Sequence, residues 1–222
     1  MFRAFQGWLA MSRSGPGEGT LLVNPLVKES GVYALLRPFF RERKTGEEVG
    51  NRERYLDEGN WVFTGGEEMG SELQGAMPGC AQEFPDGLHP HLELERTMVH
   101  IPEVKPGDYV VWHCDSIHAV DSKHAGKSDS SVLYIPVCPT TEASAQYVAR
   151  QRDAFLKGTP GPDFPGGEGE SRHIGRATEE YMRKYCDPLA VQAMGLEKLT
   201  AAKDDTPGGK EAVERANAVL GF

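Results

Sequence analysis

The short apolar runs of this chain, each closed after a few residues by glycine or proline, constrain its fold more than any other feature. Turn-forming stretches such as "SGPGEG" and "KPGD" separate the runs. Short, regularly interrupted strands are typical of an antiparallel sandwich or barrel and disfavour a parallel sheet with crossover helices. The sequence therefore predicts a mainly β fold, and the β-prone runs are residues 1–12, 20–26, 92–104, 109–113 and 130–137.

Between the second and third of these runs the pattern is less definite. Residues 31–40, "GVYALLRPFF", fit either a short helix or a strand, because an apolar run of this length has no decisive period. Residues 41–59 are charged and lack an apolar period, which indicates a solvated loop or a short exposed helix. Residues 60–91 contain glycine or proline every few positions, as is typical of irregular loops.

The pattern changes to a helical period after Pro139. Residues 140–158 combine a threonine cap, an acidic first turn, apolar side chains at helical spacing and a closing glycine, so they predict a long helix. Shorter helices are predicted at 177–186, 188–196 and 208–222. We therefore expect two parts: a partial sheet domain over 1–138 and a helical C-terminal extension over 139–222 that packs on it.

The charge and the cysteines disfavour several classes of partner and environment. The 222 residues carry a formal net charge of −9 without a basic patch, so nucleic acid and membranes are poor partners. The cysteines at 80, 114, 138 and 186 form no C-x-x-C pair, and the start of the chain does not resemble a cleavable signal peptide. We expect an intracellular, cytoplasmic protein with free thiols that acts on a small molecule.

The stretch "GDYVVWHCDSIHAV", residues 107–120, holds most of the residues that could carry chemistry. His113, Asp115 and His118 would make a two-histidine, one-carboxylate set for Fe(II), but strand residues alternate faces and His118 has the opposite parity. Cys114 could act as a nucleophile beside a histidine, although strand geometry turns it away from both neighbours. In a third interpretation one of these residues is a ligand and the others are structural. The residues by themselves leave all three open.

Three long strings give the chain a resemblance to a known family. They are "FRAFQGWLAMSRSGPGEGTLLVNPL", "LHPHLELERTMVHIPEVKPGDYVVWHCDSIHAV" and the segment that runs from "KSDSSVLYIPV" to "GGEGES". On these strings, which extend over most of the chain to about Leu196, the sequence is identified as a member of the DUF1479 family. The resemblance implies a double-stranded β-helix, or jelly roll, of the Fe(II)/2-oxoglutarate-dependent dioxygenase type, followed here by the C-terminal helices.

The resemblance also implies which residue binds iron. In the wider phytanoyl-CoA-dioxygenase-like group a "PGD" turn precedes the distal histidine ligand, and counting ten positions from Asp108 selects His118. The H-x-D pair that supplies the other two ligands lies, in that group, ahead of the strand that resembles residues 5–12, and it is missing here. We therefore expect an N-terminally incomplete jelly roll that is inactive alone, with Fe(II) and 2-oxoglutarate as cofactors of the complete family member.

The remaining candidates concern the cosubstrate and the pocket. Where related oxygenases carry a basic residue this chain has "KSDSSV", so the resemblance offers Lys127 with Ser130 or Ser131 for a carboxylate of 2-oxoglutarate. Arg3, on the predicted first strand, could also reach an anion. The alternative function is a non-enzymatic module that binds a small ligand. The sheet edge that an incomplete jelly roll exposes predicts self-association. Candidate pocket-lining residues are His89, His91, Trp112 and His113.

Overall fold

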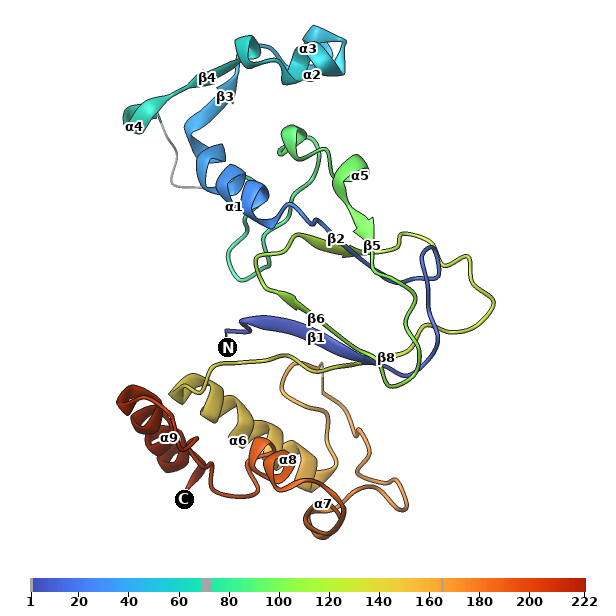
Figure 1. The fold of residues 1–222 in the computed structure, drawn as a ribbon, viewed down its shortest axis with the longest axis vertical. Helices are drawn as coiled ribbons and strands as arrows, with labels where there is room; N and C mark the ends of the chain where they lie inside the picture. The colour runs from blue at the N-terminus through green and yellow to red at the C-terminus, as the bar shows by residue number, and fades with distance from the viewer. Residues whose placement is uncertain (1, 69–72, 165) are drawn as a thin grey trace. The chain divides into compact units, whose positions relative to one another are not determined.

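The computed structural model describes residues 2–68, 73–164 and 166–222 (Figure 1). The chain divides into two compact units: one is Gln6–Ile135, and the other is Met1–Phe5 together with Pro136–Phe222. The first unit holds the sheets, and the second holds the long helices. The fold is therefore a mixture of α and β structure, with small antiparallel sheets and several helices.

Two three-stranded sheets contain most of the strands. The first has the order β6-β1-β8, from Tyr109–His113, Phe5–Ala10 and Val132–Tyr134. The second has the order β5-β2-β7, from Val99–His100, Leu21–Val23 and His118–Val120. Each predicted β-prone run thus contains a strand, and the short β7 is one that the pattern did not predict.

The predicted strand over 92–104 is wrong in its first half. The chain there forms η3 (Pro90–Leu92) and α5 (Leu94–Thr97), and β5 has two residues. Between the two helices Glu93 has φ of 43°, and the Thr97 hydroxyl donates to the carbonyl oxygens of Leu92 (2.8 Å) and Glu93 (3.2 Å). These local bonds, in a segment rich in helix-favouring residues, replace the cross-strand bonds that a strand would need.

The segment that follows β2 forms a helix and a hairpin with long inserts. Its elements are α1 (Val27–Leu36), η1 (Arg37–Phe39), β3 (Phe40–Glu42), α2 (Gly46–Val49), α3 (Arg52–Leu56), η2 (Glu58–Asn60), β4 (Trp61–Phe63) and α4 (Gly65–Glu68). The ambiguous run 31–40 is therefore helical as far as Leu36. The charged stretch contains short exposed helices, as expected, and α2 starts with a capping box between Thr45 and Glu48.

Residues 60–91, which were predicted to form irregular loops, do so in part. β4 and α4 interrupt this stretch, and residues 73–89 are turns and irregular backbone. Residues 69–72 lie outside the described part of the chain.

The second unit follows the helical prediction closely. Its helices are α6 (Glu142–Lys157), α7 (Glu179–Tyr185), α8 (Pro188–Ala193) and α9 (Pro207–Leu220). Thr141 caps α6 by accepting a hydrogen bond from the Ser144 N–H, and Gly158 ends it in the left-handed region at φ 71°. Ala145 of α6 packs with Ala216 and Leu220 of α9. In the described ranges, none of the helices is long and apolar enough to cross a bilayer.

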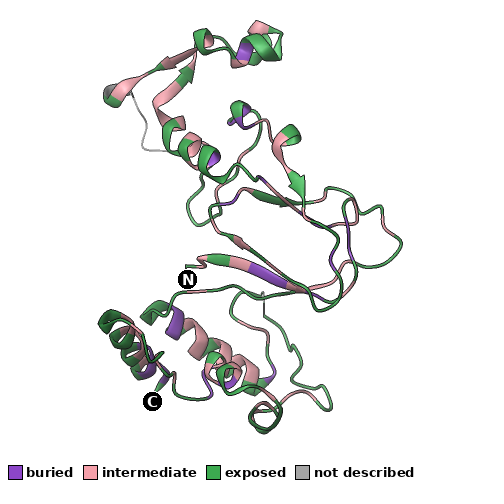
Figure 2. Cartoon of the chain, viewed as in Figure 1, coloured by how far each residue is buried: buried purple, intermediate pink, exposed green. Residues whose placement is uncertain are grey.

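The core of the first unit forms where β1 meets its neighbours. Trp8, Ala10, Leu21 and Val104 are buried together, and Figure 2 shows this buried stretch within β1. Trp112 packs against this cluster from β6. Because Trp8, Ala10 and Leu21 also line a cavity, the same packing that stabilises the sheets shapes a binding space.

Candidate functional site

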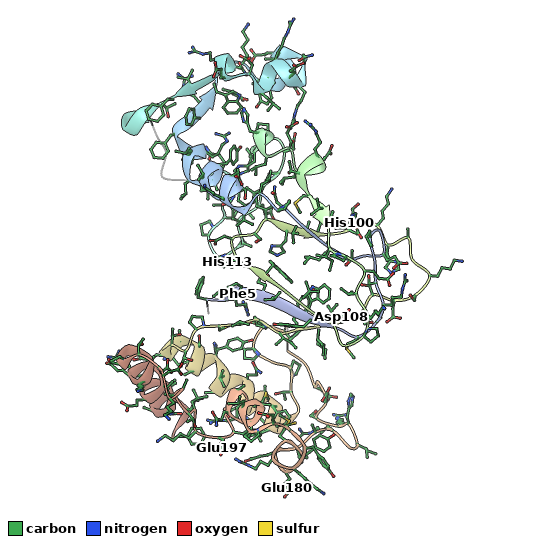
Figure 3. The ribbon with its side chains drawn as sticks, in the orientation of Figure 1. Phe5, His100, Asp108, His113, Glu180 and Glu197 are labelled. Carbon is green, nitrogen blue, oxygen red and sulfur yellow. The ribbon has the colours of Figure 1, made fainter. Side chains whose placement is uncertain are left out.

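His118 and His113 belong to different sheets. His113 ends β6, and His118 begins β7 in the other sheet. A turn over residues 114–116 joins them, closed by a 3.0 Å hydrogen bond from the Ser116 N–H to the His113 carbonyl. His113 and Asp108 mark the opposite ends of β6 (Figure 3). The turn therefore carries the chain from one sheet to the other before His118 is reached.

A cavity of about 390 Å³ is lined by side chains from both three-stranded sheets. Alternate residues of β1, β7 and β8 face it, as the two-residue period of a strand requires. Cross-strand partners share this face: Trp8 pairs with Tyr134 and Ala10 pairs with Val132. The residues that reach it from the other strands are Leu21 of β2, Trp112 of β6, and His118 and Val120 of β7.

The imidazole of His118 is held in one tautomer. Its Nδ1 lies 2.9 Å from the Ser116 carbonyl oxygen, which can only accept a hydrogen bond, so Nδ1 carries the proton. In the neutral ring the lone pair is then on Nε2. The Trp112 ring, with its centroid 5.3 Å from that of His118, packs against the imidazole. A backbone carbonyl that fixes the ring in this way is typical of a histidine that binds a metal.

Two buried polar atoms in the cavity wall are unpaired within the described ranges. They are the indole Nε1 of Trp112 and the hydroxyl of Thr20, whose residue is 3% exposed. An unpaired buried donor costs free energy that an acceptor on a ligand can recover. Five further hydroxyl-bearing residues line the same space: Ser12, Ser14, Ser130, Ser131 and Tyr134. The cavity therefore offers neutral donors, and its lining in the described part of the chain includes neither lysine nor arginine.

His118 also lines a second, larger cavity of about 790 Å³. One face of α1 contributes to it at helical spacing, through Val27, Ser30 and Ala34. Phe84 adds an aromatic ring, and the turn after β6 closes it. His118 is thus in contact with two spaces, one rich in hydroxyls and one largely apolar.

The neighbouring residues His113, Cys114 and Asp115 form a separate cluster. Their ligand atoms all lie within 4.8 Å of one another, and among the described residues His118 does not belong to this group. The expectation that Cys114 points away from both neighbours is wrong, because β6 ends at His113 and alternation stops there. Burial and a hydrogen bond to Asp115 raise the pKa of the Cys114 thiol, which argues against an activated nucleophile.

The candidates for binding a cosubstrate have different environments. Ser130 lines the cavity of His118 and donates to the Ser14 hydroxyl at 3.3 Å. Lys127 is exposed in the loop before β8. Arg3 belongs to the second unit, where its guanidinium pairs with Asp163, a carboxylate that also accepts from the Tyr147 hydroxyl. Of the predicted candidates, Ser130 and its alternative Ser131 therefore line the cavity of His118.

The two predicted loop histidines have different environments. His89 is 1% exposed, its Nε2 lies 2.7 Å from the Gln74 carbonyl oxygen, and burial lowers its pKa. His91 is exposed and contacts the Trp61 ring at a centroid distance of 4.7 Å. Neither histidine belongs to the described lining of the His118 cavity. Trp112, another predicted pocket residue, does belong to it.

The hydroxyls of Ser12, Ser14 and Thr20 were not predicted from the sequence. A signal was present for the first two, because Ser12 and Ser14 continue the even-numbered face of β1 that Trp8 and Ala10 begin. Thr20 had no such signal, since it follows a turn whose direction the sequence does not define. It is placed by its N–H, which donates to Asp121 at 3.1 Å.

Known proteins resemble this chain over most of its length. A protein of Escherichia coli K12, the uncharacterized protein YbiU, is 33% identical over 178 residues, which are 80% of this chain and 36% of YbiU. The structure of GlcNAc Inducible Gene 2 (DUF1479) from Candida albicans matches with a TM-score of 0.74 and 35% identity over 100% of this chain and 47% of that one. A structure from Salmonella typhimurium LT2, provisionally named an oxidoreductase, matches with a TM-score of 0.62 and 32% identity over 88% and 39%.

These similarities place the chain in the family that its sequence strings predicted. The Gig2-like family model matches residues 1–196. The chain belongs to the Gig2-like (DUF1479) family, and the resemblance to DUF1479 is confirmed. It spans less than half the length of the relatives named above.

Proposed function

We propose that this chain is the C-terminal part of a non-haem Fe(II)/2-oxoglutarate-dependent oxygenase of the Gig2-like family, with a double-stranded β-helix as its scaffold and a small molecule as its substrate. The observation that carries the proposal is the fixed tautomer of His118. The Ser116 carbonyl holds the Nδ1 proton, and the ring lies in the wall of a cavity that two sheets enclose. The provisional name of the Salmonella relative also supports an oxidoreductase.

The described residues do not fit a complete iron site. Such a site needs two histidines and a carboxylate that converge on one metal, and the described ligand cluster contains His113, Cys114 and Asp115 but not His118. The cavity also lacks a cationic side chain in its described lining for a dicarboxylate cosubstrate. Because His118 would hold the metal alone, we propose that this chain by itself has no oxygenase activity.

The share of the relatives that the chain spans supports the same proposal. The named relatives are matched over 36–47% of their length, so more than half of each has no counterpart in these 222 residues. We propose that the other two ligands of the family's iron site belong to polypeptide outside this segment. We also propose that residues 1–138 and 139–222 form two parts. We propose further that an exposed sheet edge leads to self-association.

Anaerobic titration with Fe(II) and 2-oxoglutarate tests the proposal. The expected result is that no metal-to-ligand charge-transfer band appears and that no succinate forms when oxygen is admitted. His118→Ala should then match the unaltered chain in both readouts. A band that forms in the unaltered chain and disappears in His118→Ala, together with succinate release, would contradict the proposed inactivity.

The second candidate function is a small-ligand-binding module without iron chemistry. The unpaired Thr20 hydroxyl and Trp112 indole favour it, because they are donors already placed for an acceptor. Calorimetric titration with 2-oxoglutarate in the presence of a chelator separates the two functions. Binding that survives both the chelator and His118→Ala, and is weakened by Thr20→Val, supports the binding module.

A further inference from the structure

A third cavity of the first unit contains chemistry that the proposed oxygenase site does not use. It has a volume of about 430 Å³, within the range of small-molecule sites. The residues that define it come from α1, η1 and the β3–β4 hairpin with its inserts, and from η3. They include four ring-bearing side chains, one cation and one carboxylate: Tyr33, Phe40, Trp61, His91, Arg37 and Glu58.

The rings hold one another in fixed orientations. His91 meets Trp61 edge to face with centroids 4.7 Å apart, and its Nε2 lies 3.0 Å from the Leu56 carbonyl oxygen. Trp61 in turn donates from its indole Nε1 to the Tyr55 carbonyl at 2.9 Å. Because these contacts fix the rings before any ligand arrives, an apolar group can enter without a large loss of side-chain entropy.

The guanidinium of Arg37 is fixed in the same way. Its Cζ lies 5.1 Å from the centroid of the Trp61 ring, Nε donates to Leu88 O at 2.9 Å, and Nη1 donates to Phe40 O at 2.8 Å. Two backbone carbonyls and one aromatic face therefore set its position. Within the described ranges these bonds to carbonyl oxygens use Nε and Nη1, so Nη2 can donate to a carboxylate.

The hydroxyl of Tyr33 is the independent observation that points to a ligand. It is buried and donates no hydrogen bond to any described residue, although Tyr33 lines the cavity. Burial raises the pKa of Tyr33 to about 12, and the charge of Arg37 and the interaction of its guanidinium with the hydroxyl offset part of that rise, so the hydroxyl keeps its proton and remains a donor. A donor in this state is satisfied when a ligand supplies an acceptor.

Glu58 decides which kind of ligand fits. It is exposed and lines the same cavity as Arg37, so a simple anion would be repelled by its carboxylate and a simple cation by the guanidinium. A ligand that carries both charges satisfies both groups. We propose that this cavity binds a free amino acid with an apolar, preferably aromatic, side chain, its carboxylate on Arg37 and Tyr33 and its ammonium group on Glu58.

Calorimetric titration of the whole chain with three probes tests this proposal. L-phenylalanine carries both charges, 3-phenylpropionate lacks the ammonium group, and phenethylamine lacks the carboxylate. We expect L-phenylalanine to bind at least about tenfold more tightly than either analogue, since each analogue leaves one charge-assisted contact unmade. Absence of binding by all three probes, or equal affinity for all three, would overturn the proposal.

Two variants assign the contacts. Tyr33→Phe should weaken L-phenylalanine binding about tenfold, and Tyr181→Phe, an exposed tyrosine of α7, should leave it unchanged. Glu58→Gln should weaken L-phenylalanine but not 3-phenylpropionate. If Tyr33→Phe loses its cooperative unfolding transition, the selectivity change in Glu58→Gln decides the proposal, because Glu58 is exposed.

The location of the site is tested separately from the oxygenase proposal. His118→Ala removes the group on which the proposed iron site depends and should leave L-phenylalanine binding unchanged. If His118→Ala abolishes that binding, or if neither Tyr33→Phe nor Glu58→Gln changes it, the assignment to this cavity is overturned.

Discussion

The hydroxyl-lined cavity at His118 and the aromatic cavity at Tyr33 offer a small ligand different kinds of contact. The first is enclosed by two sheets and offers neutral donors in its described lining, with one histidine fixed by a backbone carbonyl. The second is built from short helices and a hairpin and combines rings with one charge of each sign. Each nevertheless contains a buried hydroxyl without a partner among the described residues.

The difference shows how the surrounding structure limits the chemistry of a cavity. Charged groups are costly between two packed sheets, where partners are few, so the sheet cavity relies on serine and threonine. The hairpin cavity is more open, and Glu58 there is exposed to solvent. A charged pair can therefore be kept at the aromatic cavity at little cost in stability.

The largest expected effect concerns how much the tryptophan of each cavity contributes to the free energy of unfolding. Trp8 is 6% exposed and lies in the core, whereas Trp61 is half-buried. We expect Trp8→Ala to lower the free energy of unfolding by about 3–5 kcal/mol, and Trp61→Ala by about half of that or less. Urea unfolding of both variants measures the difference. Equal losses would mean that the aromatic cavity is as much a part of the core as the sheet cavity.

A smaller effect concerns acid stability and the carboxylates beside each cavity. Asp121 accepts from His100 Nε2 (2.6 Å) and from the N–H groups of Gly17 and Thr20. Burial acts to raise the pKa of Asp121, but these hydrogen bonds and the His100 charge outweigh it and hold the pKa below its usual value. Near the aromatic cavity, Arg52 lowers the pKa of Asp86 through a two-bond ion pair that is exposed.

A carboxyl group with a lowered folded-state pKa contributes stability that is present above its unfolded pKa, about 4, and is lost as the pH falls through the folded value. We expect Asp121→Asn to cost about 1–2 kcal/mol at pH 7 and the cost to shrink below about pH 4. Asp86→Asn should cost less at every pH, because exposed ion pairs contribute little. Thermal unfolding from pH 7 to pH 3 measures both, and a larger loss for Asp86→Asn would reverse the comparison.

The smallest effect applies to the two unpaired hydroxyls. Thr20→Val and Tyr33→Phe each remove a buried hydroxyl that makes no hydrogen bond in the described structure. Without ligand, we expect both variants to be as stable as the unaltered chain or more stable by about 1 kcal/mol. Differential scanning calorimetry measures the change. A loss of stability in either variant would show that its hydroxyl already has a partner, and that cavity would lose its strongest indication of a ligand.

The sequence predicted the helices of the second unit well because their signals are local. Thr141 and Gly158 bound α6 as the pattern indicated, since a cap depends on neighbours three or four residues away. The strands containing Trp8, Leu22 and Val132 were predicted for a similar reason. The strand over Leu92–Thr97 was not formed, because Thr97 and Glu93 bond locally and two apolar residues in alternation are a weak signal.

The candidate site was predicted in part. The family strings and the choice of His118 as a candidate came from the sequence. Trp112, predicted to line a pocket, and Ser130, predicted to bind a cosubstrate, line the same cavity as His118. The role of Arg3 could not be predicted from the sequence, because it precedes β1 and its partner Asp163 is 160 residues away. Likewise, nothing in the order of residues brings Tyr33 to His91.

The sequence by itself determined the family, the β-rich first part and the helical second part, because periodicity, caps and long family strings are read along the chain. The tertiary structure alone decided that the turn after His113 carries His118 into a second sheet. It also decided that the buried hydroxyls of Thr20 and Tyr33 donate to no residue in the described ranges, and that Arg37 and Glu58 share an aromatic cavity. The physical reason is that a cavity is made by residues far apart in sequence, whose proximity depends on how strands and helices pack.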